Sequence, residues 1–155
     1  MLPPKLSSSS RPQAKRFTAN KPKDRIVAQA YHYLGTPYRL GGSLETGRAT
    51  DCSGFVQYVY QKSNIDLPRS SREQAREGQV VSRTLNFARL LPGDLLFFGN
   101  RRRRINHVGI YLGDGRMIHA SNSRHKVVIS DLEEEPYLQS AFVVAKRLPE
   151  VQASI

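Results

Sequence analysis

Residues 51–62 read Asp-Cys-Ser-Gly-Phe-Val-Gln-Tyr-Val-Tyr-Gln-Lys, and the interpretation of the whole chain depends on this stretch. Its apolar side chains recur every three or four residues, which predicts an amphipathic helix with a buried face formed by Phe55, Val56, Val59 and Tyr60. Thr50 or Asp51 can cap the start of that helix. Cys52, the only cysteine of the chain, therefore falls in the first helical turn.

The segments on either side of this helix predict two more helices and a loop. Helical spacing of apolar residues begins after Asp24, the expected N-cap, and ends near Leu34. Residues 38–50 contain three glycines, which favours a loop. Residues 70–78 predict a short helix that begins with a serine cap and ends at Gly78.

The second half of the chain predicts strands. Leu95-Leu96-Phe97-Phe98 is a continuous apolar run, typical of a buried strand, and Gly113-Asp114-Gly115 is a hairpin signal. Extended segments are expected at residues 80–81, 95–98, 107–112, 116–120, 127–129 and 142–147. Because helices come first and a strand meander follows, the pattern predicts an α+β fold, with N-terminal helices packed on a mostly antiparallel sheet.

Length and composition predict one domain. The chain has 155 residues, of which 39% are hydrophobic, and no apolar run approaches the ~18 residues that a membrane-spanning helix needs. Residues 1–23 are rich in Ser, Pro, Lys and Arg and are expected to be a disordered basic tail. We expect the folded domain at residues 24–148 and a C-terminal tail at 149–155. No apolar stretch follows Met1, so a secretory signal peptide is not expected.

The net charge is +11, with 24 basic and 13 acidic residues, and it favours an anionic partner such as nucleic acid, membrane headgroups or a polyanionic cell wall. Much of this charge lies in residues 1–25 and in the run Arg101-Arg102-Arg103-Arg104. No basic segment is interleaved with aromatic residues, so specific nucleic-acid recognition is not expected. The arginine run is interpreted either as a solvated loop or as an attractor for substrate carboxylates.

Cys52 has two interpretations on its own. A lone cysteine excludes an intrachain disulfide and a zinc site built from several cysteines, and free cysteines are often inert and buried. At a helix start, however, unpaired backbone N–H groups and the helix dipole favour a thiolate, and Ser53 and Gly54 leave space beside the sulfur. No metal or cofactor is expected for either interpretation.

Among the four histidines, two are expected to lie together. Val108, Ile110 and Leu112 alternate as the apolar set of their strand, which leaves His107 on the other face. A three-residue hairpin loop would pair Leu112 with Arg116, and His107 and His119 would then share a face. A two-residue loop would shift the register and separate them. His32 and His125 are expected at the surface.

The motifs together resemble the NlpC/P60 peptidases, a papain-like family. The resemblance extends from about residue 24 to residue 148 and keeps the order of the family's blocks, which in this sequence are Gly-Thr-Pro-Tyr-Arg-Leu-Gly-Gly at 35–42, Asp-Cys-Ser-Gly-Phe-Val at 51–56, Leu-Pro-Arg-Ser at 67–70, Pro-Gly-Asp-Leu at 92–95, His-Val-Gly-Ile-Tyr at 107–111 and Ile-His-Ala-Ser at 118–121. Within the family the chain is similar to the Spr-type murein endopeptidases.

The resemblance implies a role for each matching residue. Cys52 would be the nucleophile, His107 the general base, and His119 the group that orients this base. Tyr38 would help to hold the oxyanion. The residues that flank the thiol, Asp51 and Ser53, would contact the substrate. Arg69 matches the Leu-Pro-Arg-Ser block, and a structural role is at least as well supported for it.

The resemblance also implies a substrate and a location. The substrate would be peptidoglycan, cut at the cross-link between D-alanine and meso-diaminopimelate, or alternatively between D-glutamate and the diamino acid. We expect a monomer without a transmembrane segment, acting in the periplasm or elsewhere in the cell envelope. The rival interpretations are a basic module that binds nucleic acid and a non-catalytic domain that binds the cell wall.

Overall fold

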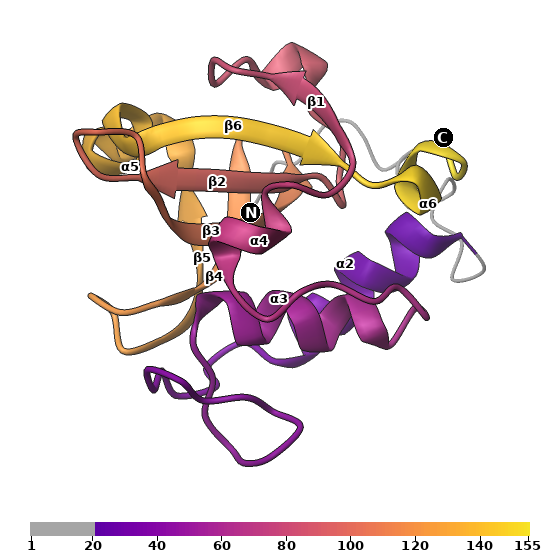
Figure 1. Cartoon of the computed structure of the whole chain (residues 1–155), viewed down its shortest axis with the longest axis vertical. Coiled ribbons are helices and arrows are strands. Elements are labelled where there is room, and N and C mark those ends of the chain that lie inside the picture. Colours follow the sequence, from indigo (N-terminus) through magenta and orange to yellow (C-terminus); the bar gives the residue numbers. More distant parts are fainter. Residues whose placement is uncertain (1–20) are drawn as a thin grey trace, which may run out of the picture.

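A six-stranded antiparallel sheet forms the centre of the computed structural model, which describes residues 21–155 (Figure 1). Its strand order is β1-β6-β2-β3-β4-β5, and every neighbouring pair is antiparallel. The strands are β1 (Gln79–Ser82), β2 (Leu95–Gly99), β3 (Ile105–Gly113), β4 (Arg116–Ser121), β5 (Lys126–Asp131) and β6 (Phe142–Arg147). The α+β class and the mostly antiparallel sheet predicted from the sequence are confirmed.

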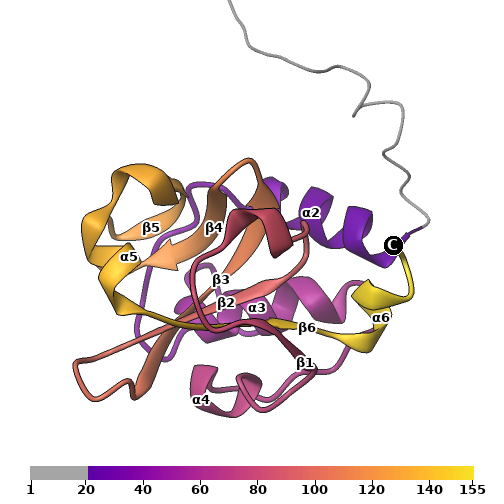
Figure 2. The same ribbon diagram turned by 90° about the horizontal axis from the view of Figure 1, so that it is seen from above.

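Helices surround this sheet. Its α-helices are α2 (Pro22–His32), α3 (Cys52–Gln61), α4 (Ser71–Gln74), α5 (Pro136–Ala141) and α6 (Pro149–Gln152), and two short 3-10 turns are η1 (Phe87–Arg89) and η2 (Leu132–Glu134). The helix that bears Cys52, α3, packs against β3 and β4. Helices α5 and α6 lie at opposite ends of the sheet in both views of the ribbon (Figures 1 and 2).

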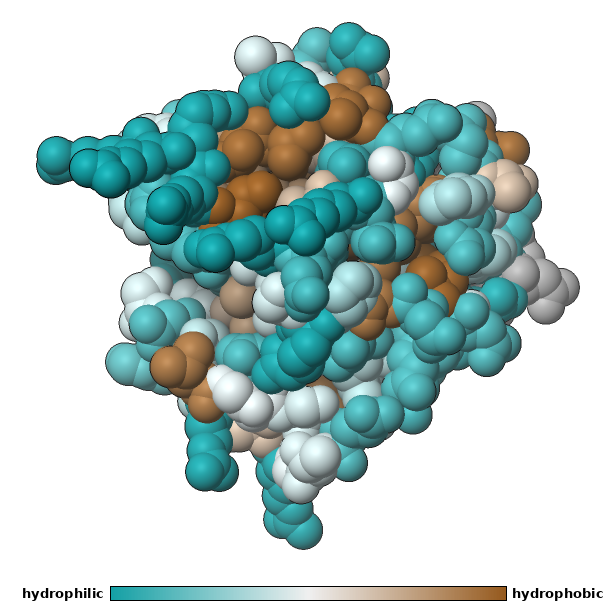
Figure 3. All heavy atoms as spheres, viewed as in Figure 1, coloured by the Kyte–Doolittle hydropathy of each residue, from teal (hydrophilic) through white to brown (hydrophobic). Residues whose placement is uncertain are grey.

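Both faces of the sheet are buried. Leu95 and Phe97 of β2 join an apolar cluster with α2 and α3. Leu96 and Phe98 point to the other face and join a second cluster, which includes Leu132 of η2 and residues of α5 and β6. Burial on two faces explains why β2 is continuously apolar. On the face of the molecule shown in Figure 3, hydrophilic residues separate smaller apolar groups.

Both ends of the expected domain differ from the sequence-based boundaries. Residues 1–20 of the expected disordered tail lie outside the described residues, but α2 already begins at Pro22. Proline fits the first helical position, so Lys21 is the N-cap and Asp24 lies inside the first turn. At the other end, α6 falls within the expected C-terminal tail, because Val151 is fully buried and holds this segment against the domain.

The helix expected at residues 70–78 is shorter than predicted. It begins as expected: the hydroxyl of Ser70 accepts a hydrogen bond from the backbone N–H of Glu73 and donates one to its carboxylate. The regular α-helix α4 ends at Gln74, which is fully buried and whose side-chain amide donates to the backbone carbonyls of Ser53 and Pro68. This contact anchors α4 beside the start of α3.

The β3–β4 hairpin reaches the expected register by a different turn. Gly113 pairs with Arg116, so the loop has two residues, and the predicted Leu112–Arg116 pair is wrong. A register shift between Tyr111 and Gly113 inserts one extra residue into β3 and offsets the shorter loop. Beyond this bulge, Ile110 pairs with Ile118, as the longer loop would require. His107 and His119 therefore still share a face.

Candidate active site

The loop before α3 holds the helix start that carries Cys52. Asp51 is the N-cap: one carboxylate oxygen accepts a hydrogen bond from the Gly54 N–H at 2.8 Å, and the other accepts from the Gly41 N–H at 2.9 Å. A Cβ atom at Gly54 would lie 2.6 Å from the Gly42 carbonyl oxygen, so only glycine allows this close packing. These contacts fix Cys52 in the first turn, where 8% of its surface is exposed.

Arg69 also holds the start of α3 in place. Its guanidinium forms an ion pair with Asp51, with an Nη1–Oδ1 distance of 3.0 Å and an Nη2–Oδ2 distance of 3.1 Å, and donates to the hydroxyl of Ser53 at 2.9 Å. It also donates to the Gly42 carbonyl. The side chains of Asp51 and Ser53 are therefore bound within the protein, and a contact of either with substrate stays a prediction.

Three neighbouring strands supply a chain of polar side chains. Nε2 of His107 on β3 lies 2.7 Å from Nδ1 of His119 on β4, with the two rings nearly perpendicular. Nε2 of His119 lies 2.8 Å from the hydroxyl oxygen of Ser130 on β5. His119 and Ser130 are buried. The expected pairing of the two histidines is present, and Ser130 extends it by one residue that the sequence reasoning missed.

These contacts determine which ring nitrogens are available. Nε2 of His107 is engaged by His119, so only Nδ1 of His107 is left for a reacting group. If that nitrogen is to accept a proton, the neutral ring must carry its hydrogen on Nε2 and donate it to His119. His119 then donates its own Nε2–H to Ser130. The arrangement is thus compatible with the tautomer of His107 that a general base needs.

Burial controls the charges of these groups. It lowers the pKa of His107 from 6.5 to about 4. Burial, followed by the charges of His107 and Arg124, lowers the pKa of His119 to about 3. Burial also raises the pKa of the Cys52 thiol, although hydrogen bonds from the backbone of Val108, Ser53 and Cys52 itself act in the opposite direction. The resting site therefore holds a neutral thiol and neutral imidazoles.

A cavity of about 650 Å³ brings four of the six sequence-predicted site residues together: Tyr38, Cys52, His107 and His119. Burial raises the pKa of Tyr38, and a negative charge on the Cys52 sulfur would raise it further. The rest of the wall comes from β2, β3, the β4–β5 turn, β5 and α5. It includes Phe98, Asn106, Ser121, Asn122, Ser123, Arg124, Ser130, Glu135, Tyr137, Leu138 and Ala141.

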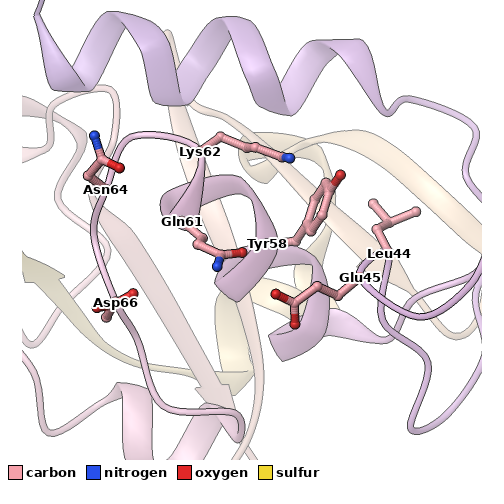
Figure 4. A pocket seen from close by; sticks show the side chains of 7 residues that line it. All are labelled: Leu44, Glu45, Tyr58, Gln61, Lys62, Asn64 and Asp66. Carbon is pink, nitrogen blue, oxygen red and sulfur yellow. The ribbon is translucent and has the colours of Figure 1, made fainter.

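The other charged and polar features lie away from this cavity. His32 and His125 are exposed, as expected, and the four arginines 101–104 occupy the exposed loop between β2 and β3. A second hollow of about 610 Å³ lies on the outer side of α3, where Figure 4 shows the Lys62 ammonium directed toward the Tyr58 ring. It contains neither cysteine nor histidine.

Residues 21–155 contain neither a cluster of metal-ligating side chains nor a membrane-spanning helix. In that range no group of three or more His, Cys, Asp or Glu side chains is placed to hold a metal ion. Likewise, none of the helices in this part of the chain is both long and apolar enough to cross a membrane.

An α+β domain that places a helix-start cysteine and a pair of histidines, one buried and one half-buried, in one cavity has the architecture of a cysteine peptidase. The sequence makes the assignment more specific, because the model of the NlpC/P60 family matches residues 35–147. The chain belongs to the NlpC/P60 family.

Curated relatives and solved structures agree with this membership. The chain is 42% identical over 129 residues to murein DD-endopeptidase MepS/murein LD-carboxypeptidase of Escherichia coli K12, covering 81% of this chain and 63% of the relative. It is 44% identical over 112 residues to gamma-DL-glutamyl hydrolase of Bacillus subtilis, covering 71% of this chain and 26% of the relative. A crystal structure of an NlpC/P60 family protein from Bacillus cereus superposes with a TM-score of 0.72 at 33% identity, covering 81% of this chain and 39% of that one.

Proposed function

We propose that this protein is a cysteine endopeptidase that hydrolyses peptide bonds of bacterial peptidoglycan, at the cross-link between D-alanine and meso-diaminopimelate. The observation that carries the proposal is the 2.7 Å contact between His107 and His119 in the cavity that Cys52 also lines. A lone buried cysteine needs no such neighbours. A thiol beside an oriented, neutral imidazole can become a nucleophile when a substrate arrives.

The proposed reaction is acyl transfer in two steps. His107 takes the proton of the Cys52 thiol while the sulfur bonds to the amide carbon, and the carbonyl electron pair moves onto oxygen. Backbone N–H groups at the start of α3 and the Tyr38 hydroxyl would stabilise this oxyanion. The C–N bond then breaks and His107 returns the proton to the leaving amine. Water hydrolyses the thioester, which restores the thiol and releases a carboxylate.

The names of two relatives favour different bonds, and the first of them supports peptidoglycan as the substrate. The Escherichia coli relative is named a DD-endopeptidase and LD-carboxypeptidase of murein, which favours the D-alanyl cross-link. The Bacillus subtilis relative is named a gamma-DL-glutamyl hydrolase, which makes a gamma-glutamyl bond, such as the one between D-glutamate and the diamino acid, the second candidate. This chain spans about 63% of the length of the first relative, so its substrate is proposed for the domain alone.

A peptidoglycan substrate also suggests where in the cell the protein acts. The polymer lies outside the cytoplasmic membrane, so we propose action in the periplasm or elsewhere in the cell envelope. We propose that the protein acts as a monomer, because one copy of the chain supplies every residue to which the proposed reaction gives a role.

Mass analysis of digested peptidoglycan separates the candidates. Cleavage of the D-alanyl cross-link converts dimeric muropeptides to monomers with intact stems. Cleavage after D-glutamate instead leaves disaccharides that carry only a dipeptide. Monomers with intact stems are the expected product, and the shortened stem would select the second candidate. If the folded protein binds peptidoglycan and releases neither product, the peptidase proposal is wrong and a cell-wall-binding domain replaces it.

A further inference from the structure

One wall of the catalytic cavity carries a pair of opposite charges that the proposed chemistry does not use. Arg124 lies in the turn between β4 and β5, and Glu135 lies immediately before α5. Both side chains line the cavity together with Cys52 and His107. The Nη2 atom of Arg124 and the Oε2 atom of Glu135 are 3.9 Å apart.

This pair is loosely held, although its backbone is fixed. A distance of 3.9 Å exceeds hydrogen-bond length, and 58% of the Arg124 side chain and 29% of the Glu135 side chain are exposed. Such exposed pairs contribute little to stability. The Glu135 side chain makes no capping hydrogen bond to α5. By contrast, the Arg124 backbone N–H donates to the hydroxyl of Ser121, which fixes the turn. Both charged groups therefore remain available to a ligand.

The pair also lies within electrostatic reach of the catalytic residues. The positive charge of Arg124 contributes to the lowered pKa of His119. Leu138 and Ala141 of α5 supply apolar surface along the same wall, beside the exposed ring of Tyr137. A ligand group at this place would thus meet one cation, one anion and an apolar strip.

We propose that Arg124 and Glu135 form a subsite for the amino-acid end of the diaminopimelate side chain in the acyl-donor stem, whose amine is free, with its carboxylate on Arg124 and its ammonium on Glu135. The methylene groups of that side chain contact the α5 wall. An ammonium and a carboxylate on one carbon have no net charge and match the adjacent opposite charges of the pair. Lysine has the ammonium but lacks the carboxylate, so the subsite selects diaminopimelate peptides over lysine peptides. This inference rests on the proposed peptidase function.

The test uses two cross-linked stem-peptide dimers that differ only in diaminopimelate or L-lysine at the third position. For the unmodified protein we expect kcat/KM to be about 10-fold higher on the diaminopimelate dimer. This factor corresponds to the free energy of one charge-assisted hydrogen bond. Arg124→Gln is expected to reduce this preference to about 2-fold or less by lowering kcat/KM on that dimer alone. The matched control is Arg116→Gln, because Arg116 is exposed at the other end of β4, and it is expected to keep the full preference.

Each result supports or overturns the subsite. Glu135→Gln is expected to lower kcat/KM on both dimers by a similar factor, since both carry the ammonium, and an unchanged value would overturn the role of Glu135. Equal cleavage of the two dimers by the unmodified protein would overturn the subsite and leave the peptidase proposal intact. Cleavage of neither dimer would overturn the peptidase proposal. Calorimetric binding of both dimers to Cys52→Ala, which cannot turn over, is expected to show the same preference.

Discussion

Nε2 of His107 lies 2.7 Å from Nδ1 of His119, and this contact orients the ring that faces the cavity. Because His119 is itself held by Ser130, the orientation depends on β3, β4 and β5 together. The site is therefore a property of the sheet as much as of the helix that carries Cys52. The following predictions separate the contributions of these elements.

His119→Ala is expected to lower kcat by about 100-fold with little change in KM, because His107 loses the acceptor that fixes its tautomer. His119→Gln is expected to keep more activity, since its amide oxygen can accept the same hydrogen bond. Ser130→Ala, which removes one neutral hydrogen bond, is expected to lower kcat by about 5-fold. Steady-state kinetics on a soluble muropeptide would measure all three. Full activity of His119→Ala would contradict the positioning role.

The acid limb of the kcat/KM profile is expected near pH 4. Burial lowers the pKa of His107 to about 4, so the imidazole stays neutral, and able to accept a proton, down to that pH. Below it, the base becomes protonated and activity falls. The profile of kcat/KM reports groups of the free enzyme, so rates between pH 3.5 and 8 test this directly. A limb near 6.5, the ordinary value for histidine, would mean that the surroundings of His107 do not lower its pKa.

Arg69→Ala is expected to lower the free energy of unfolding by about 1–2 kcal/mol, because the buried carboxylate of Asp51 loses its ionic partner. This expected loss of unfolding free energy is smaller than the loss from breaking a fully buried ion pair, since 39% of the Arg69 side chain is exposed. Urea denaturation would measure the change. Arg72→Ala, an exposed arginine in α4 without a described ion pair, serves as the control and is expected to change stability by less than about 0.5 kcal/mol.

Gly109→Ala is expected to damage both stability and activity. A Cβ atom at this position would lie 2.6 Å from Cγ of Met117 and 3.1 Å from Cβ of His119. Met117 is fully buried, so its side chain can move aside only by disturbing the packing around it, at a cost of about 1–3 kcal/mol. Thermal unfolding and kcat would both report this. Gly47→Ala is the control, because nothing lies within 4 Å of its Cβ. Equal behaviour of the two variants would contradict the tight packing.

The sequence predicted the elements whose residues interact locally. The helical spacing after Cys52 and the alternation around His107 identified α3 and β3, because each pattern repeats within one element. The register of the β3–β4 hairpin is harder to predict from the sequence. The glycines around Asp114 indicated a tight turn, but the bulge after Tyr111 depends on how β3 packs along its whole length. From the sequence, a shared face for His107 and His119 is expected only with a three-residue loop, whereas the structure has a two-residue loop and a bulge.

Contacts between distant segments could not be predicted from local patterns. Ser130 is one polar residue in a strand, and its contact with His119 depends on the pairing of β4 with β5. The only sequence signal was a serine directly after the apolar run Val127-Val128-Ile129. Arg69 reaches Asp51 from 18 residues away, which no periodicity reports. The short helix α5, with Glu135 before it, has too few residues to show a helical repeat.

The most direct test of the central claim compares the unmodified protein with Cys52→Ala on purified peptidoglycan. Both proteins are first checked for the same circular dichroism spectrum and thermal unfolding, since Cys52 is buried. We predict that the unmodified protein releases soluble muropeptides and that Cys52→Ala lowers the rate at least about 1,000-fold, because the acyl-transfer nucleophile is lost. Muropeptide release at a similar rate by folded Cys52→Ala would contradict the account.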